Sequence, residues 1–500
     1  MQTLLTSEQT RRADKFTIGA RGIASIDLME SAATAFVSAF KGYFAWLDVA
    51  ISIYCGTGNN GADGLAIARL LKEQGYDRLS VKIARFGNTT SEDFRINLER
   101  LKLTGISVTD IAASDELHSE DADIIIDALL GSGLSRPLDG EFDKLAVYLN
   151  NLGKTIVSVD VPTGFPSEDV IRKGSTIIKA GLAISFQRPR INFFFPESAP
   201  YIKRFRSVDI GLDESFIQSQ PREWTLLEPD DIREIMKPRE AFSHKGTFGH
   251  ALIVAGNTGT MGAALLCADA CLHSGAGLTT ACIPAEGLSA LNSFSPEVMY
   301  LPRNKSAEID FAKYQAIAIG PGLGTDDPQV KLLKHILSNI SSQVVMDADA
   351  LNIISRHPEI LGMLPHNVIF TPHLKEFDRL FGAHNSWWER VATGRSVARQ
   401  HAMIIIIKNR YTFIILPDGN VVINPTGNPA MATGGTGDVL TGVIAGLLAQ
   451  GYSPEQAALA GVYLHGKAGD ILAECSGMYS IPSRYLIKKL PEVIGSYASE

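Results

Sequence analysis

Strand-like runs alternate with helical runs along most of this chain, and this alternation limits the possible folds more than any other feature. Short runs rich in Ile and Val indicate buried strands, and longer runs with apolar residues three or four positions apart indicate helices. The predicted strands are 49–55, 79–86, 123–129, 154–159, 251–255, 277–283, 316–319, 343–347, 367–371, 404–408, 411–416 and 421–424, and the main predicted helices are 61–74, 94–104, 261–273, 327–339 and 439–448. Such alternation produces parallel sheets with crossover helices, so we predict an α/β protein.

The length and the middle of the chain indicate two domains. A chain of 500 residues exceeds the usual size of one domain. From about Val208 to Arg239 the periodicity weakens while Pro, Asp and Glu accumulate, and we interpret this stretch as a linker. No fixed repeat is visible, so the halves are different domains rather than a duplication. We predict a Rossmann-like three-layer parallel sheet at 1–217, which begins with two helices, and a second three-layer α/β domain at 218–500.

Composition argues against several functions. The formal net charge of −8 at pH 7 supplies no basic face for a phosphate backbone, so we expect no nucleic-acid partner. No run of about 18 apolar residues is present, and the first residues lack the apolar core of a secretory signal, so we expect no membrane span. The five cysteines are odd in number and lie mostly in apolar surroundings. We interpret them as buried free thiols in a reducing cytoplasm.

The most informative single stretch is NPTGNPAMATGGTGDVLT, residues 424–441. Its glycines precede a predicted helix, so backbone N–H groups and the positive end of the helix dipole converge where an anion can bind. The carboxylate of Asp438 stands in this turn, where it can take a proton from a hydroxyl that attacks phosphorus. A turn that only starts a helix is the alternative. The GTGD sequence at 435–438 resembles the anion-hole signature of ribokinase-like enzymes, in which this Asp is the base.

A second polar turn lies in the N-terminal half. The sequence CGTGNNGADG, residues 55–64, follows a strand and opens a helix, and its glycines satisfy the G-x-G-x-x-G pattern of dinucleotide-binding folds. No acid follows the second strand to bind a ribose, so we prefer a turn whose polar side chains hold ligand hydroxyls. Asp127 and Asp160 end two later strands, at the edge where parallel sheets bind ligands. One such Asp is often a helix cap, but three polar strand ends together favour a site.

These residues resemble the epimerase domain of the NAD(P)H-hydrate repair enzymes over about residues 1–215, through CGTGNNGADG, DALLGSGL and VDVPTG. The resemblance implies that Asp160 contacts the hydrated nicotinamide ring and moves protons. It also implies a K⁺ site formed by Asn60, Asp127 and Thr163, an oxygen set that suits a hard cation. The implied substrate-binding residues are Asn59, Asn60, Gly61, Ala62, Asp63, Gly131, Ser132, Gly133, Leu134, Ser135, Arg136 and Pro137.

The sequence departs from the family pattern in two places. Ala62 replaces a glycine, and an alanine would be strained if the position requires a positive φ. The continuation FPSEDV after Gly164 also differs. The same domain occurs in an mRNA-decapping scaffold that lacks this catalysis, which leaves a binding module as an alternative. The presence of Asp127 and Asp160 favours the enzyme.

Four further motifs, HKGTFGH, GPGLG, DADALN and TPHLKEF, precede the GTGD sequence in the second half. Together they resemble the ADP- or ATP-dependent dehydratase of the same repair system, a ribokinase-like fold, over about residues 225–495. The implied nucleotide-binding residues are Lys408, Asn409, Arg410, Tyr411, Thr412 and Gly437. The implied contacts to the hydrate are Ala263, Gly322, His373 and Asp438, and Glu376 is a candidate carboxylate on the Mg²⁺ side.

The resemblance implies a bifunctional repair enzyme that acts on hydrated NADH and NADPH. The first domain would interconvert their R and S forms, and the second would dehydrate the S form with Mg²⁺ and an adenine nucleotide. Both domains on one chain suggest a bacterial member, and hence ADP rather than ATP. We expect small-molecule partners and a homo-oligomer. The alternative enzyme is a ribokinase-like small-molecule kinase joined to a nucleotide-binding module, which would leave a stable phosphorylated product.

One motif match is misleading. Residues 461–467 satisfy the P-loop pattern G-x-x-x-x-G-K, but the next residue is Ala468, which has no hydroxyl for Mg²⁺. Apolar residues continue through the match at helical spacing. We therefore predict a buried helix here.

Overall fold

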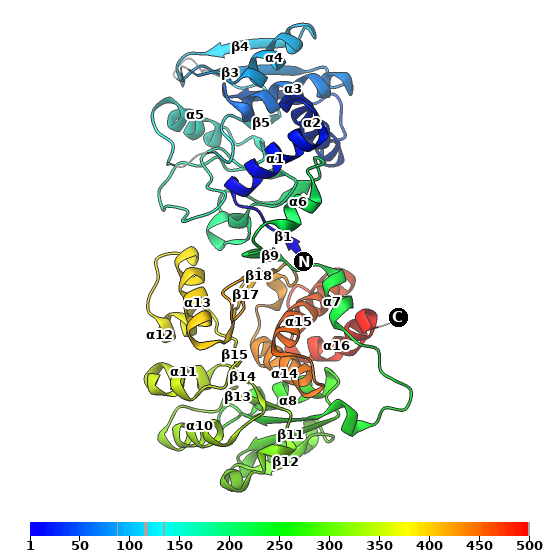
Figure 1. Ribbon diagram of the computed structural model, residues 1–500, viewed down its shortest axis with the longest axis vertical. Helices are drawn as coiled ribbons and strands as arrows, with labels where there is room; N and C mark the ends of the chain where they lie inside the picture. The colour runs from blue at the N-terminus through cyan, green and yellow to red at the C-terminus, as the bar shows by residue number, and fades with distance from the viewer. Residues whose placement is uncertain (88, 115–118, 134–135, 499–500) are drawn as a thin grey trace. The chain divides into compact units, whose positions relative to one another are not determined.

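The computed structural model describes residues 1–87, 89–114, 119–133 and 136–498, and they form two compact units (Figure 1). The N-terminal unit comprises Thr3–Arg222 and Ser386–Trp388. The C-terminal unit comprises Met1–Gln2, Glu223–Asn385 and Glu389–Glu500. Each unit has its own sheet and its own hydrophobic core, as expected for separate domains.

The N-terminal unit contains a seven-stranded sheet in the order β4-β3-β2-β5-β6-β7-β8, in which every pair is parallel. The strands are β2 (Ile51–Cys55), β3 (Leu79–Ala84), β4 (Ser107–Ile111), β5 (Ile124–Ala128), β6 (Thr155–Val159), β7 (Leu182–Phe186) and β8 (Phe205–Val208). The central strands β2 and β5 are fully buried, which explains their continuous apolar sequence.

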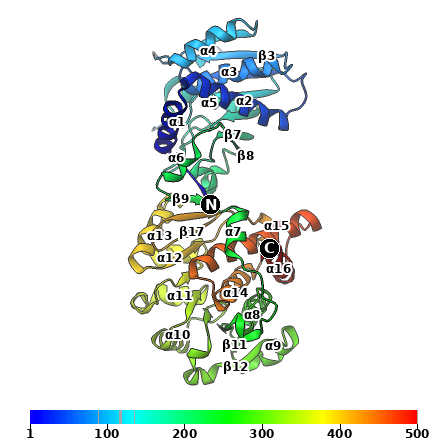
Figure 2. The same cartoon turned by 45° about the vertical axis from the view of Figure 1, so that its right-hand side comes forward.

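Helices cover both faces of this sheet (Figure 2). They are α1 (Ser7–Arg21), α2 (Ser25–Tyr43), α3 (Asn59–Glu73), α4 (Glu92–Lys102), α5 (Gly140–Asn151) and α6 (Glu214–Ser219). Ile53 on β2 packs with α2 and α3, whereas its neighbour Tyr54 packs with α5 on the opposite face. This alternation confirms the predicted three-layer architecture.

The C-terminal unit contains an eleven-stranded sheet in the order β1-β9-β18-β17-β16-β15-β14-β13-β10-β11-β12. Its strands are β1 (Gln2–Thr3), β9 (Trp224–Leu226), β10 (His250–Val254), β11 (Leu278–Ile283), β12 (Met299–Pro302), β13 (Ala316–Ile319), β14 (Gln343–Met346), β15 (Ile369–Phe370), β16 (Ile404–Ile407), β17 (Thr412–Ile415) and β18 (Val421–Asn424). The strands from β12 to β16 are parallel, and β17 is antiparallel to both β16 and β18.

Two groups of helices flank this sheet (Figure 1). One group packs in the main core: α7 (Pro229–Ile235), α8 (Met261–His273), α14 (Thr436–Ala449), α15 (Pro454–Ser476) and α16 (Ser483–Ala498). Leu291 of the short helix α9 (Leu288–Phe294) also belongs to this core, and the other helices are α10 (Asp327–Asn339), α11 (Asp349–Arg356), α12 (Leu374–Phe381) and α13 (Trp387–His401). Helices α8 and α14 approach closely, because a Cβ at Gly442 would lie 2.1 Å from the Cys267 carbonyl oxygen.

The structure corrects the predicted linker between Val208 and Arg239. This stretch contains α6, β9 and α7, and β9 pairs with β18 of the C-terminal sheet. These elements have six, three and seven residues, too few for a periodicity to be recognised in the sequence. The two compact units divide at Arg222/Glu223, and α6 extends past the predicted boundary at 217/218.

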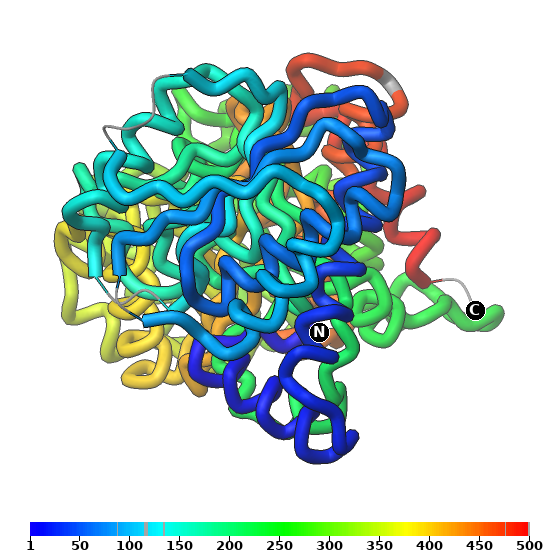
Figure 3. The backbone as a smooth tube through the Cα atoms, turned by 90° about the horizontal axis from the view of Figure 1, so that it is seen from above, coloured from blue at the N-terminus to red at the C-terminus, as the bar shows by residue number. Residues whose placement is uncertain are grey.

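Among the described residues, no single helix has the length and apolar character needed to cross a membrane. Helices α1 and α2 pass that test only as a pair, and they are bent by 115° at their junction (Figure 3, blue).

Replacing glycine with alanine at one position of this contact, and at one control position, tests the packing of α8 on α14. Gly442→Ala should lower the free energy of unfolding by about 1–3 kcal/mol, because the added methyl group overlaps the Cys267 carbonyl. Gly495→Ala in α16 is the matched control, since no described atom outside its own helix backbone lies within 4 Å of its added Cβ. Better helix propensity should raise the control's stability by about 0.5–1 kcal/mol. Urea denaturation measures both, and equal stabilities would contradict this packing.

Candidate active sites

The carboxyl ends of β5, β6 and β7 meet the start of α3 around a cavity of about 430 Å³ in the N-terminal unit. Its lining includes seven of the predicted site residues: Asn59, Asn60, Asp63, Gly131, Ser132, Gly133 and Asp160. It also includes Asp14 and Arg190, which the sequence motifs do not contain. The structure therefore brings these seven residues together at one cavity, with further residues from other parts of the fold that the sequence motifs did not include.

The polar turn after β2 depends on glycines at close backbone contacts. A Cβ at Gly61 would lie 1.8 Å from the Gly56 carbonyl oxygen, and one at Gly56 would lie 2.1 Å from the Leu129 carbonyl oxygen. Ala62 lies within α3, is fully buried and does not have a positive φ. The strain considered for Ala62 is therefore absent, because a helical position accepts alanine.

Asp127 at the end of β5 is completely buried beside Thr163. Its carboxylate accepts hydrogen bonds from the Thr163 hydroxyl at 2.6 Å and the Thr163 N–H at 2.9 Å, and another from the Ser158 hydroxyl at 2.9 Å. Burial raises its pKa and outweighs these hydrogen bonds. Within the described part of the chain, no Lys, Arg or His forms an ion pair with this carboxylate.

Asn60 completes the predicted cation set. Its side chain lies against Gly131, where an added Cβ would be 3.2 Å from the Asn60 Oδ1. Its Nδ2 is buried without a hydrogen-bond partner. The amide, carboxylate and hydroxyl oxygens of Asn60, Asp127 and Thr163 are therefore of the kind that a hard cation prefers, and no basic side chain of the described residues pairs with Asp127 in its place.

Asp160 follows β6 with a left-handed backbone, at φ 64°. Its Oδ1 accepts from Arg190 Nη2 at 2.5 Å and Nε at 3.2 Å, and from the Phe186 N–H at 3.3 Å and the Ser185 hydroxyl at 3.4 Å. Both members of the ion pair are buried. The remaining carboxylate oxygen, Oδ2, accepts no hydrogen bond from the described residues, so it is available to a ligand in the cavity.

A second cavity of about 460 Å³ shares Ser132 and Gly133 with the first. Its lining contains the predicted residues Arg136 and Pro137. The predicted residues Leu134 and Ser135 lie outside the described part of the chain. Arg11 and Arg172 also line this cavity, together with the acids Glu168 and Asp169, so residues outside the predicted loop supply it with charged groups of both signs.

In the C-terminal unit, Asp438 lies in the first turn of α14, after Gly435 with φ 88°. Burial, together with the nearby Asp347, raises the Asp438 pKa to about 6, although Lys408 lowers it. A carboxylate with this pKa is suited to accept a proton near neutral pH. The glycine-rich stretch therefore does start a helix beside an acid, as predicted.

Lys408, at the end of β16, lies near Asp438 and contacts other residues of this site. Its Nζ lies 2.8 Å from Asp347 Oδ1, and the Thr441 hydroxyl donates to Asp347 Oδ2 at 2.9 Å. A Cβ at Gly437 would lie 3.4 Å from Lys408 Nζ, which brings two predicted nucleotide-binding residues together. Asp347 was recognised as part of a strand-end motif, but its ion pair with Lys408 could not be predicted from the sequence.

The other predicted nucleotide-binding residues continue from Lys408 into β17. Arg410 stacks on the Tyr411 ring at 4.6 Å and donates to the Pro425 carbonyl oxygen at 3.0 Å. The Thr412 hydroxyl donates to the Asn409 carbonyl oxygen at 3.2 Å. Residues 409–412 therefore lead from β16 into the antiparallel strand β17, close to the predicted anion site.

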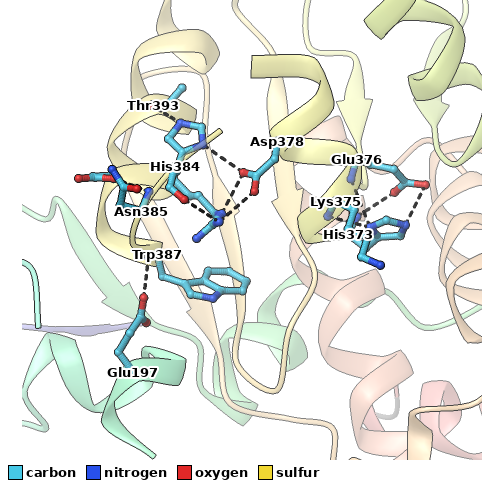
Figure 4. Close-up of polar contacts among 11 residues, drawn as sticks. Glu197, His373, Lys375, Glu376, Asp378, His384, Asn385, Trp387 and Thr393 are labelled. Carbon is cyan, nitrogen blue, oxygen red and sulfur yellow. Dashed lines mark hydrogen bonds and ion pairs between the residues drawn. The ribbon is translucent and has the colours of Figure 1, made fainter. Parts of the chain in front are cut away.

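His373 begins α12 and is half-exposed (Figure 4). Its Nδ1 accepts from the N–H groups of Lys375 and Glu376, while Glu376 Oε2 accepts from the His373 N–H at 2.9 Å. This reciprocal cap leaves Nε2 to carry the ring proton. Burial raises the pKa of Glu376, and the Lys408 charge opposes that shift.

The other two predicted hydrate contacts, Ala263 and Gly322, are both hydrogen-bonded to Thr260. The Thr260 hydroxyl donates to the Gly322 carbonyl oxygen at 2.7 Å, and the Ala263 N–H donates to the Thr260 carbonyl oxygen at 3.2 Å. Gly322 has a φ of 59°, and a Cβ there would lie 2.7 Å from the Thr260 carbonyl oxygen. Glycine is therefore required at this position.

The P-loop-like match at 461–467 lies inside α15 and is mostly buried, which confirms the predicted helix. His465 Nε2 donates to the Thr436 carbonyl oxygen at 3.1 Å, and burial lowers the His465 pKa to about 4. This segment therefore supports the start of α14 instead of forming a separate phosphate site.

Two family models match the chain. The model described as YjeF-related protein N-terminus matches residues 25–191, and the model described as NAD(P)H-hydrate dehydratase matches residues 251–492. Among solved structures, a ribokinase-like superfamily protein from Enterococcus faecalis has a TM-score of 0.51 at 31% identity and covers 56% of this chain and 98% of its own. The ADP/ATP-dependent NAD(P)H-hydrate dehydratase from Bacillus subtilis, co-crystallised with ATP/Mg²⁺, has a TM-score of 0.50 at 33% identity, with coverages of 55% and 98%.

The fold and the sites thus define a two-domain α/β enzyme whose C-terminal unit is ribokinase-like, as predicted. The bifunctional NAD(P)H-hydrate repair enzyme of Moorella thermoacetica is 33% identical, over 99% of this chain and 97% of its own. That of Escherichia coli is 29% identical, over 98% and 94%. The chain belongs to the family of bifunctional NAD(P)H-hydrate repair enzymes.

Two methionine substitutions test the buried ion pair of Asp160. Arg190→Met should lower the free energy of unfolding by about 3–5 kcal/mol, because it leaves a buried carboxylate without its cation. Arg188→Met is the matched control, since Glu214, its partner, is half-exposed and such pairs contribute about 0–1 kcal/mol. Chemical denaturation measures both. Equal losses in the two variants would contradict the special role of Arg190.

Proposed function

We propose that residues 1–217 epimerise the R and S forms of hydrated NADH and NADPH, and that residues 218–500 dehydrate the S form with ADP, giving AMP and phosphate. The observation that carries this proposal is the presence of two separate sites at the carboxyl ends of parallel strands, one with Asp160 lining a cavity and the other with Asp438, whose pKa burial raises to about 6. The related enzymes that match almost the whole chain are named bifunctional NAD(P)H-hydrate repair enzymes.

In the dehydratase, Asp438 takes the proton of the C6 hydroxyl of the hydrated ring. That oxygen attacks the terminal phosphorus of the nucleotide, and the bond to the leaving AMP oxygen breaks. Phosphate is a better leaving group than hydroxide. Its departure with the C6–O electron pair, and loss of a proton from the neighbouring ring carbon, restores the reduced nicotinamide. The raised pKa of Asp438 supports its assignment as the base.

The nucleotide would lie along Lys408, Asn409, Arg410, Tyr411, Thr412 and Gly437, with the hydrate against Ala263, Gly322 and His373. Lys408 and the start of α14 offer positive charge for its phosphates. Mg²⁺ bound with the nucleotide would neutralise phosphate charge. The carboxylate of Glu376 lies close enough to Lys408 and Asp347 to influence their electrostatics, and we assign it to the Mg²⁺ side.

In the epimerase, the hydrated ring would occupy the cavity beside Asp160, whose Oδ2 faces no other described donor. Asn60, Asp127 and Thr163 would hold K⁺. The turn at 59–63 and the loop at 131–137 would hold the rest of the substrate. The arginines of the adjoining cavity, Arg11, Arg136 and Arg172, supply charge for the substrate's phosphates.

We also propose a homo-oligomer in the cytoplasm. The cellular location rests on the five free thiols, of which Cys55, Cys267, Cys271 and Cys282 are buried.

K⁺ should stabilise the free protein through Asp127. Replacing choline chloride with KCl at equal ionic strength should raise the melting temperature of the wild type, because a ligand that binds only the folded state stabilises it. Asp127→Asn should lose this increase. Asp139→Asn, at an exposed carboxylate, is the control and should keep it. An equal K⁺ effect on all three proteins in a thermal-shift assay would contradict a site at Asp127.

Two substitutions should separate the activities. Asp438→Asn should abolish recovery of reduced nicotinamide from the S hydrate while R–S interconversion persists. Asp160→Asn should slow interconversion and leave dehydration intact, because each carboxylate serves its own site. Chromatography of the two hydrate forms and near-ultraviolet absorbance measure the two rates. Loss of both activities in one folded variant would contradict independent sites.

A further inference from the structure

Three carboxylates and two guanidinium groups, of which Arg11 is one, line the cavity of the N-terminal unit. Asp14 comes from α1, Asp63 from α3 and Asp160 from the end of β6, and Arg190 follows β7. All four line the same cavity of about 430 Å³. The epimerase motifs contain Asp63 and Asp160, but they do not contain Asp14, which lies about 40 residues before the first motif.

Asp160 is poorly placed to be the only group that transfers protons. Four donors converge on its Oδ1, and two of them belong to the Arg190 guanidinium. The third guanidinium nitrogen, Nη1, donates to the Thr10 hydroxyl at 3.0 Å. This network holds Asp160 in place, but it contains no acid that can give a proton to the reaction.

Asp14 lies in the same electrostatic environment without a direct partner. Within the described part of the chain, no hydrogen bond or ion pair to its carboxylate is present. Burial raises its pKa to about 6; the Arg190 charge opposes this shift, and Asp160 adds to it. Asp63 and Arg11 are the other charged groups at this wall of the cavity, and burial holds the pKa of Asp63 well above its usual range. Asp14 is therefore the cavity acid that can both give and regain a proton near neutral pH.

We propose that Asp14 is the second catalytic residue of the epimerase, the acid that protonates the departing hydroxyl while Asp160 acts as the base. This assignment rests on the proposed epimerase function.

The step balances with water as the only co-reactant. Protonated Asp14 gives its proton to the C6 hydroxyl, the C–O bond breaks with its electrons going to oxygen, and water leaves. The lone pair of the ring nitrogen forms a C=N double bond, so the ring becomes a cation. A water molecule then adds to the opposite face of C6 and loses a proton to Asp160. The proton returns to Asp14 through solvent, and the product is the epimer.

The test measures R-to-S conversion of NADH hydrate by chromatography without nucleotide, so that the dehydratase is idle. Asp14→Asn should slow the enzyme-catalysed rate by about 100-fold or more, which is typical for loss of a general acid. Asp14→Glu should retain measurable activity with a shifted pH profile. Glu8→Gln, an exposed acid on the same helix, is the matched control and should behave as wild type.

The pH profile separates catalysis from folding. For the wild type, kcat/KM should fall as pH rises above about 6, because Asp14 must be protonated. Wild-type activity in Asp14→Asn would overturn the assignment. An unshifted pH profile in Asp14→Glu would also overturn it, and this second result tests the assignment even if Asp14→Asn fails to fold. If Asp160→Asn is inactive while Asp14→Asn is active, only this inference fails. A wild-type protein that does not interconvert the hydrates would refute the proposed function itself.

Discussion

Both sites depend on carboxylates that the fold buries, and a buried carboxylate is stable only when a cation or several donors compensate its charge. Asp160 pairs with Arg190 at 2.5 Å, and Asp347 pairs with Lys408 at 2.8 Å. Asp127 is also buried; Thr163 and Ser158 donate hydrogen bonds to it, but no basic side chain of the described residues pairs with it. A K⁺ ion at Asp127 would add the positive charge that the other two carboxylates receive from the chain, and this is the physical basis of the proposed metal site.

Each unit also places a second carboxylate beside the compensated one. Asp14 lies near the Asp160 pair and Asp438 near the Asp347 pair, and burial is the main cause that raises the pKa of both to about 6. Two carboxyl groups in different environments can divide the work of holding charge and moving protons. The two units therefore use one electrostatic arrangement for different reactions: exchange of a hydroxyl between ring faces, and transfer of a phosphoryl group.

The sequence predicted most of the fold because strong local patterns determine it. The predicted helices at 261–273 and 327–339 match α8 and α10, and the isoleucine run at 404–408 forms β16. The short elements of the supposed linker were missed because their pairing partners, such as β18 for β9, lie almost 200 residues away. Local motifs likewise identified the strand-end acids. They could not identify Asp14 and Arg190, whose role depends on how α1 and the segment after β7 pack around the cavity.

The measurement that tests the central claim most directly is the return of reduced-nicotinamide absorbance from a mixture of R and S NADH hydrates with the protein, Mg²⁺ and ADP. The account predicts complete recovery with formation of AMP and phosphate, because one site supplies the S form and the other removes its hydroxyl. Recovery of the S share alone would contradict an active epimerase. A stable phosphorylated product without recovery would contradict the dehydratase and indicate a kinase.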